Sequence, residues 1–146
     1  MWGVKMSLVE FEGALIPENP AWVSPALRLP LSRVLSANDR LARGQAAKKV
    51  AFIRSQAMLL ARAGRAPRFE RGEVKVIVRF PDGRRRDPNN YHATTKPLID
   101  GLVDAGVFPD DDAEHVLGPD IRKSSKRAEP SLMSPMFDFI VLIYAY

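Results

Sequence analysis

Residues 84–114 read RRRDPNNYHATTKPLIDGLVDAGVFPDDDAE, and the other elements of the chain can be placed relative to this stretch. It begins with three arginines and Asp87, continues through a segment with helical spacing, and ends in three consecutive aspartates. Three adjacent carboxylates repel one another unless solvent or a cation offsets their charge. Oxygen ligands from two loops are what a hard divalent cation such as Mg²⁺ prefers. A single short helix between the loops would let Asp87 and the aspartate triplet share one ion.

The segment between the two loops predicts an amphipathic helix. Thr94 would cap it through its hydroxyl, Pro97 would lie in its first turn, where no intrahelical donor is lost, and Gly106 would end it. The buried face of this helix is predicted to consist of Leu98, Ile99, Leu102 and Val103. On the opposite face, spaced four residues apart, lie Lys96, Asp100 and Asp104.

The residues before this stretch predict one strand and one longer helix. Residues 73–80 (EVKVIVRF) alternate in polarity, which indicates a half-buried strand, and residues 81–83 (PDG) then turn the chain. Residues 43–63 repeat apolar side chains at steps of three and four, which predicts a helix that ends at Gly64. Its apolar stripe is made of Ala46, Val50, Ile53, Ala57 and Leu60. The cations off this stripe form either a solvated face or a DNA-facing one.

The remaining segments complete the predicted sheet. Residues 26–31 indicate a strand that Pro30 confines to an edge or to its own end. Residues 116–122 are compatible with a further strand, residues 123–135 are polar and loop-like, and residues 137–146 have the β-branched and aromatic composition of a strand. The order strand, helix, strand, helix, strand, strand predicts an α+β fold, with two main helices packed on a mixed β-sheet.

The whole chain of 146 residues has the length and composition of one ordinary domain. We expect residues 1–25 to be an N-terminal extension, with a short strand near residues 8–11, and residues 26–146 to form the domain. The absence of cysteine excludes disulfides and thiolate metal sites and fits a reducing cytoplasm. No signal-peptide pattern is visible, and the longest apolar run, residues 137–146, is too short to span a bilayer.

The net charge of +5 conceals two regions of opposite sign. Residues 40–86 hold 14 Lys or Arg and 3 acidic residues, a net charge of +11, whereas residues 87–114 hold 7 acidic residues and one lysine, a net charge of −6. A basic half beside an acidic pocket suits a metal nuclease, because phosphates can bind one part and react at the other. The same pattern is also typical of a solvated basic helix next to an ordinary acidic loop.

The order RRRD, Asn, Lys96, DGLVDAG and the acidic run resembles the RusA-like Holliday-junction resolvases, small metal-dependent endonucleases of bacteria and phages. The resemblance is specific from residue 84 to residue 112, looser over residues 27–80, and absent before about residue 25. It implies that Asp87, Asn89 and Asp111 hold the metal, with Asp110 or Asp112 contributing. It further implies a catalytic role for Asp87, Asp111 and Lys96.

Two features of this chain differ from the pattern of that family. Asn89 stands where the family has a second acid, and three extra residues lie between Asn90 and Lys96. Asparagine can offer a carbonyl oxygen to Mg²⁺ but brings no charge. We therefore hypothesise that Asp112 supplies the missing charge.

The resemblance implies a Mg²⁺-dependent enzyme, with Mn²⁺ as a possible substitute, that resolves four-way DNA junctions by paired nicks in DNA recombination and repair. It also implies a homodimer in the cytoplasm of a bacterium or phage-infected cell and no membrane partner. The phosphates would be held by Arg40, Arg84, Arg85 and Arg86. Two alternatives remain open: Lys96 as an ordinary surface ion-pair partner of Asp100, and a branched-DNA-binding module whose nuclease activity is lost.

Overall fold

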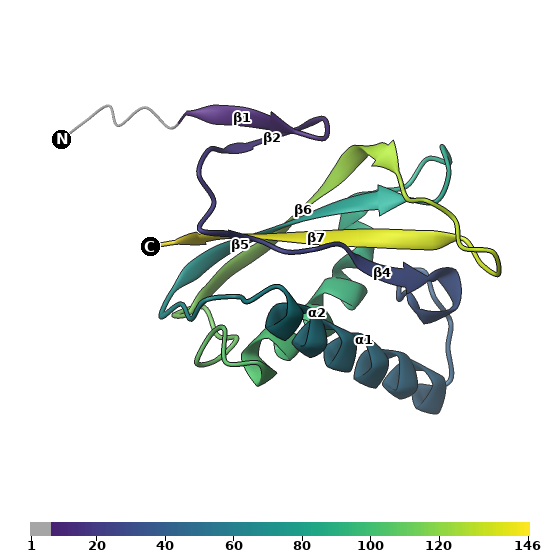
Figure 1. The fold of residues 1–146 in the computed structure, drawn as a ribbon. Coiled ribbons are helices and arrows are strands. Elements are labelled where there is room, and N and C mark those ends of the chain that lie inside the picture. The colour runs from purple at the N-terminus through teal and green to yellow at the C-terminus, as the bar shows by residue number, and fades with distance from the viewer. Residues whose placement is uncertain (1–6) are drawn as a thin grey trace.

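The computed structural model describes residues 7–146 and has the predicted α+β fold, a mixed sheet with two helices packed on one face (Figure 1). The central strands are β5 (Gly72–Phe80) and β7 (Met136–Ala145), which pair antiparallel along their length. The other edge of β5 pairs in parallel with β6 (Val116–Arg127). The other edge of β7 carries two short strands, β3 (Trp22–Val23) and β4 (Leu27–Pro30).

Helices α1 (Arg43–Ala63) and α2 (His92–Asp104) bury their apolar faces against the sheet, and two short 3-10 turns, Leu31–Arg33 and Pro88–Tyr91, accompany them. The two helices touch backbone to backbone, because a Cβ on Gly101 would overlap the carbonyl oxygen of Arg54. As predicted, α1 ends at Gly64, and Gly106 follows the end of α2 with a positive φ of 82°. These glycines therefore set where each helix stops and how closely the two approach.

Three details of the helices differ from the prediction. The Thr94 hydroxyl does not cap α2 but is buried, accepting from the Leu35 amide at 2.8 Å and donating to the Leu35 carbonyl at 2.6 Å. Because α2 begins earlier, at His92, Pro97 lies inside the helix rather than in its first turn. Val50 is 37% exposed, since the buried positions of α1 begin only at Ile53. For Thr94, the contact with the distant Leu35 overrides the local capping pattern.

The second face of the sheet is covered by a hairpin of β1 (Leu8–Phe11) and β2 (Ala14–Pro17), which lies above the sheet in Figure 1. The short strand expected near residues 8–11 is thus confirmed. A second core forms between hairpin and sheet, made of Ala14, Ile16, Ile77, Ile140 and Leu142. The prediction of a half-buried strand at 73–80 is therefore wrong, because β5 is covered on both faces. The division at residue 25 stays a prediction.

The turn of this hairpin is attached to the sheet by Glu12. Its carboxylate accepts two hydrogen bonds from Arg79, at 2.7 and 2.6 Å, and one from the Ser124 hydroxyl at 2.7 Å. Arg79 also contacts the buried Asp138, which Arg28 reaches from β4. A chain of alternating charges therefore links the hairpin, β5, β7 and β4 on this face.

The C-terminal part of the sheet is longer than predicted. β6 continues beyond residue 122 to Arg127, because its parallel pairing with β5 extends to the Phe80–Arg127 position. Residues 123–127, predicted as loop, are therefore strand, and the connection to β7 is confined to residues 128–135. Within residues 7–146, no helix has the length and apolar character needed to cross a membrane.

Candidate functional site

The structure brings Lys96 of α2 into contact with Asp111, in the loop that follows the helix. The Lys96 ammonium also donates to Asp100 at 3.1 Å, so two carboxylates share one cation. The hydrogen bond from Lys96 lowers the pKa of Asp111, and the same bond raises the pKa of Lys96. All three side chains are partly exposed, which leaves the cluster open to a ligand from solvent.

The three consecutive aspartates point their carboxylates in different directions. Asp111 faces Lys96, whereas Asp110 accepts the Asp111 amide at 2.7 Å. Asp112 accepts the Glu114 amide at 3.1 Å and lies 2.6 Å from Nδ1 of His115. Asp112 would have to leave His115 before it could compensate for Asn89. The structure thus places Asp111, the predicted ligand of the three, beside Lys96, whereas its role as a metal ligand stays a prediction.

Asp87 caps the 3-10 turn that leads into α2, with its carboxylate accepting the Asn89 amide at 3.0 Å. It is exposed, and no ion pair in the described part of the chain involves it. The neighbouring arginines pair with Asp82 instead, Arg86 at 2.6 Å and Arg84 at 3.8 Å. The hydrogen bond from Arg86 lowers the pKa of Asp82 to about 2. These arginines therefore pair with Asp82 rather than with Asp87, whose carboxylate stays accessible.

Within residues 7–146 no group of three or more acidic, histidine or cysteine side chains lies close enough to hold a metal ion. The structure therefore does not gather Asp87 with two aspartates of the triplet. Mg²⁺, however, commonly keeps several waters and binds through one or two carboxylates together with substrate phosphates. Asp100 and Asp111 both contact the Lys96 ammonium, so the oxygen donors that Mg²⁺ and Mn²⁺ accept are present there once that ammonium moves aside.

Asp100 was not predicted as a metal ligand. The sequence placed it only as an ion-pair partner of Lys96, four residues earlier on one helix face. The shared face was the available signal, but nothing local showed that Asp111 would approach the same lysine.

A basic hollow of about 400 Å³ lies beside the segment that carries Asp87. Its cations are Lys49, Arg84 and Arg86, and its apolar floor includes Tyr91 and Phe137. Arg86 is largely buried and lies over the rings of Phe80 and Phe137, whereas the side chain of Arg84 is 78% exposed. Arg84 is therefore the arginine of this hollow that can reach a phosphate.

The turn before α1 also contributes to the basic hollow. Ser36 and Asp39 line it, and the Ser36 amide donates to the Asp39 carboxylate at 2.8 Å. Asp39 therefore closes this turn, while the N-cap of α1 is Ala42. Arg40 is exposed but is not among the residues of the hollow, and Arg85 is exposed on the loop after β5. Phosphate binding by Arg40 and Arg85 stays a prediction.

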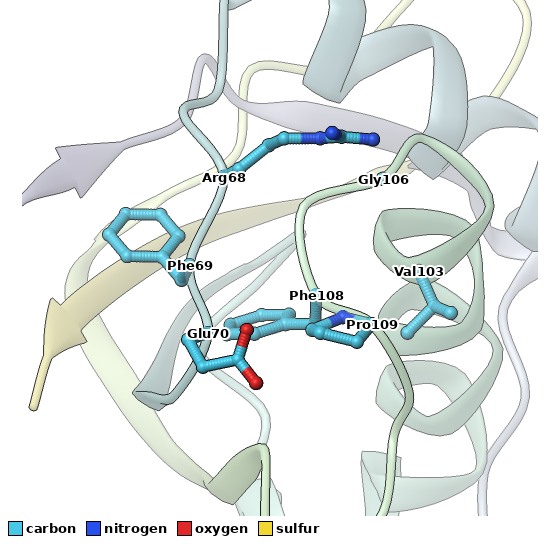
Figure 2. Close-up of a pocket in the computed structure, with 7 residues that line it drawn as sticks. All are labelled: Arg68, Phe69, Glu70, Val103, Gly106, Phe108 and Pro109. Atoms are coloured by element: carbon cyan, nitrogen blue, oxygen red, sulfur yellow. The ribbon is translucent and has the colours of Figure 1, made fainter.

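A different pocket, of about 450 Å³, lies at the C-terminal end of α2 (Figure 2). It is lined by Arg68, Phe69, Glu70, Val103, Gly106, Phe108 and Pro109. In Figure 2 the Arg68 side chain extends toward Gly106, and Glu70 lies beside Phe108 and Pro109. None of the predicted site residues lines this pocket, so it is separate from the Lys96–Asp111 contact.

No protein-family model and no curated protein matches this chain. The resemblance to RusA-like resolvases is thus an interpretation of the sequence.

Proposed function

We propose that this chain is a metal-dependent, structure-selective endodeoxyribonuclease that resolves four-way DNA junctions by paired nicks, in DNA recombination and repair. The observation that carries the proposal is the contact of Lys96 with Asp111 beside Asp100. A cation already lies between two carboxylates there, and both remain open to solvent. Phosphodiester hydrolysis at a metal ion uses such a combination of carboxylates and a positive side chain.

Each residue of this site has a proposed role. Asp111 and Asp100 would hold Mg²⁺, which when bound supplies an activated water and neutralises charge on the leaving oxygen. The Lys96 ammonium lowers the pKa of Asp111, because it stabilises the ionised carboxylate that would bind a metal ion. Lys96 would stabilise the charge that develops on the transferred phosphate. Asp87 and Asn89, on the loop before α2, remain proposed ligands because Asp87 is exposed and free of arginine.

The basic hollow and the exposed arginines would bind the DNA. Arg84 and Arg85 precede Asp87, a proposed metal ligand, on the same loop. They would therefore hold phosphates next to that ligand. Such contacts position a duplex without reading its bases. A homodimer would present one site to each of the two strands that must be cut, because a four-way junction has two-fold symmetry. A cytoplasmic setting belongs to the same proposal.

To test this proposal, the protein is incubated with a labelled four-way junction in Mg²⁺ or Mn²⁺, and the incubation is repeated with a chelator. We expect symmetric metal-dependent nicks from the wild type, loss of nicking in Asp111→Asn, and retained binding of the junction by that variant. Asp104→Asn is the matched control, because Asp104 lies on the same helix but pairs with Arg54 at 2.5 Å. Undiminished cleavage by Asp111→Asn would contradict the proposed site.

A second function is favoured by one observation, the lack of a group of three metal-binding side chains in residues 7–146. Together with Asn89, it fits a branched-DNA-binding module without nuclease activity. Such a module needs the cations but not Asp111. A shifted but intact junction at every metal concentration would support this alternative.

A further inference from the structure

The loop between β6 and β7 exposes two adjacent apolar side chains at its tip. Leu132 is 104% exposed and Met133 is 92% exposed, more than any other large apolar residue in the described part of the chain. Burying side chains of this kind against an apolar surface is favourable, because it removes apolar area from water. Neither contributes to the core, so their exposure suits contact with something outside the chain.

The turn at the tip is closed by its own hydrogen bonds. The Ser131 amide donates to the Ser134 carbonyl at 3.1 Å, and the Ser134 amide donates to the Ser131 hydroxyl oxygen at 3.0 Å. Proline precedes this turn at residue 130 and follows it at residue 135. The two apolar side chains are thus presented on an ordered turn, which reduces the entropy lost when they are buried on binding.

The loop is also fixed against the end of the sheet that carries the predicted DNA-binding arginines. The Leu31 amide at the end of β4 donates to the Pro135 carbonyl at 3.0 Å, and the Ala128 amide donates to the Phe80 carbonyl at the end of β5 at 2.9 Å. In Figure 1 the loop lies beside the end of β4. The segment after β5, residues 81–87, contains Arg84 and Arg85.

The exposed charges at this end of the sheet are mostly positive. The exposed cations on the neighbouring segments are Arg33, Arg84, Arg85, Lys126 and Arg127. Among acidic residues, Glu129 lies in the loop, Asp82 is paired with Arg86, and Asp87 is exposed at the end of the segment after β5. A partner that covers Leu132 and Met133 therefore also faces these cations, which favours a negatively charged partner. A nucleic acid offers negatively charged phosphates around an apolar stack of bases.

We propose that Leu132 and Met133 form a wedge that inserts between bases at the branch point of DNA, while the surrounding cations hold the phosphates. Apolar side chains that enter a base step partly unstack it, which is unfavourable in intact duplex. That cost is smaller where bases are already unpaired or poorly stacked. The wedge would therefore favour a junction over a duplex. The inference rests on the DNA binding of the proposed function but does not require cleavage.

The test measures binding in chelator, so that cleavage plays no part. The substrates are a four-way junction with 2-aminopurine at the branch point and a duplex of equal length. We expect the wild type to raise 2-aminopurine fluorescence and to prefer the junction. The double variant Leu132→Ala/Met133→Ala should bind the duplex with wild-type affinity. Its preference for the junction over the duplex should fall by about tenfold or more, and 2-aminopurine fluorescence should not rise. Leu59→Ala is the matched control, because Leu59 is 51% exposed on α1.

An unchanged junction preference in the double variant would overturn the inference. So would loss of binding to anionic phospholipid vesicles in that variant, which would assign the tip to a membrane surface. A shift from dimer to monomer in sedimentation would likewise assign it to a second copy of this chain. If the wild type binds no DNA, the inference and the proposed function both fail. If it binds the junction without cutting it, only the nuclease proposal fails.

Discussion

Replacement of Gly101 by alanine should weaken the fold, because this glycine lies where α2 touches α1. The new methyl would overlap the Arg54 carbonyl oxygen and lie 2.7 Å from the Ala57 Cβ and 3.1 Å from the Met58 nitrogen. Two of these atoms belong to the backbone of α1, so they cannot rotate away. The helices would have to separate, which would loosen the packing of Leu98 and Leu102 on the sheet.

The expected loss combines two opposing terms. Forcing an extra methyl into a packed core costs about 1–3 kcal/mol. Alanine in a helix interior is favoured over glycine by about 1 kcal/mol, which offsets part of that cost. Because the overlap involves backbone atoms that cannot move aside, the cost lies in the upper half of that range, and we expect Gly101→Ala to lower the free energy of unfolding by about 1–2 kcal/mol.

The measurement is urea denaturation followed by far-ultraviolet circular dichroism. Gly44→Ala provides the control, because Gly44 also lies in a helix but no atom lies within 4 Å of its added Cβ. It should be neutral or stabilise the protein by less than about 1 kcal/mol. A Gly101→Ala variant that unfolds at the wild-type urea concentration or above it, with an unchanged slope, would refute the close crossing of α1 and α2.

Two further predictions concern the hairpin and the basic hollow. Two hydrogen bonds from Arg79 lower the pKa of Glu12 from its ordinary 4.5 to about 2. The ionised form of Glu12 therefore stabilises the fold above pH 4.5, and this contribution is lost as the pH falls toward 2. Glu12→Gln should lower the free energy of unfolding by about 2 kcal/mol at pH 7, with the difference vanishing near pH 2; a constant difference across this range would contradict the linkage. Lys49→Gln should weaken junction binding and reduce the salt slope of log K by about 0.9, whereas Lys48→Gln, one position along α1, should change both less. Both affinities are measured by fluorescence anisotropy. Equal losses of junction affinity in the two variants would show that the basic hollow is not part of the DNA interface.

The local patterns of the sequence predicted most of the elements. The three- and four-residue spacing over residues 43–63 predicted α1, and the β-branched run at the C-terminus predicted β7. The prediction of β6 stopped five residues short, because residues 123–127 are too polar to indicate a strand. They form one because β5 already offers an edge for parallel pairing.

For the candidate site, the sequence indicated which residue types and which two loops to consider, together with Lys96 as the helix residue facing them. The local sequence could not show which of the three adjacent aspartates faces Lys96, because side-chain direction in a loop depends on which partners lie nearby. The structure turns Asp111 toward Lys96 and Asp112 toward His115. Asp100 contacts Lys96 because the two lie four residues apart on one helix face, which the spacing indicated.

Features that depend on near neighbours along the chain were therefore predictable: helical and strand periodicity, helix ends at glycine, and the separation of positive from negative charge. Contacts between residues far apart in the chain were not. Thr94 bonds to Leu35 rather than to its own helix, and Glu12 ties an N-terminal hairpin to Arg79. Such contacts form because a buried polar group must find a partner wherever the fold places one, which spacing along the chain does not encode.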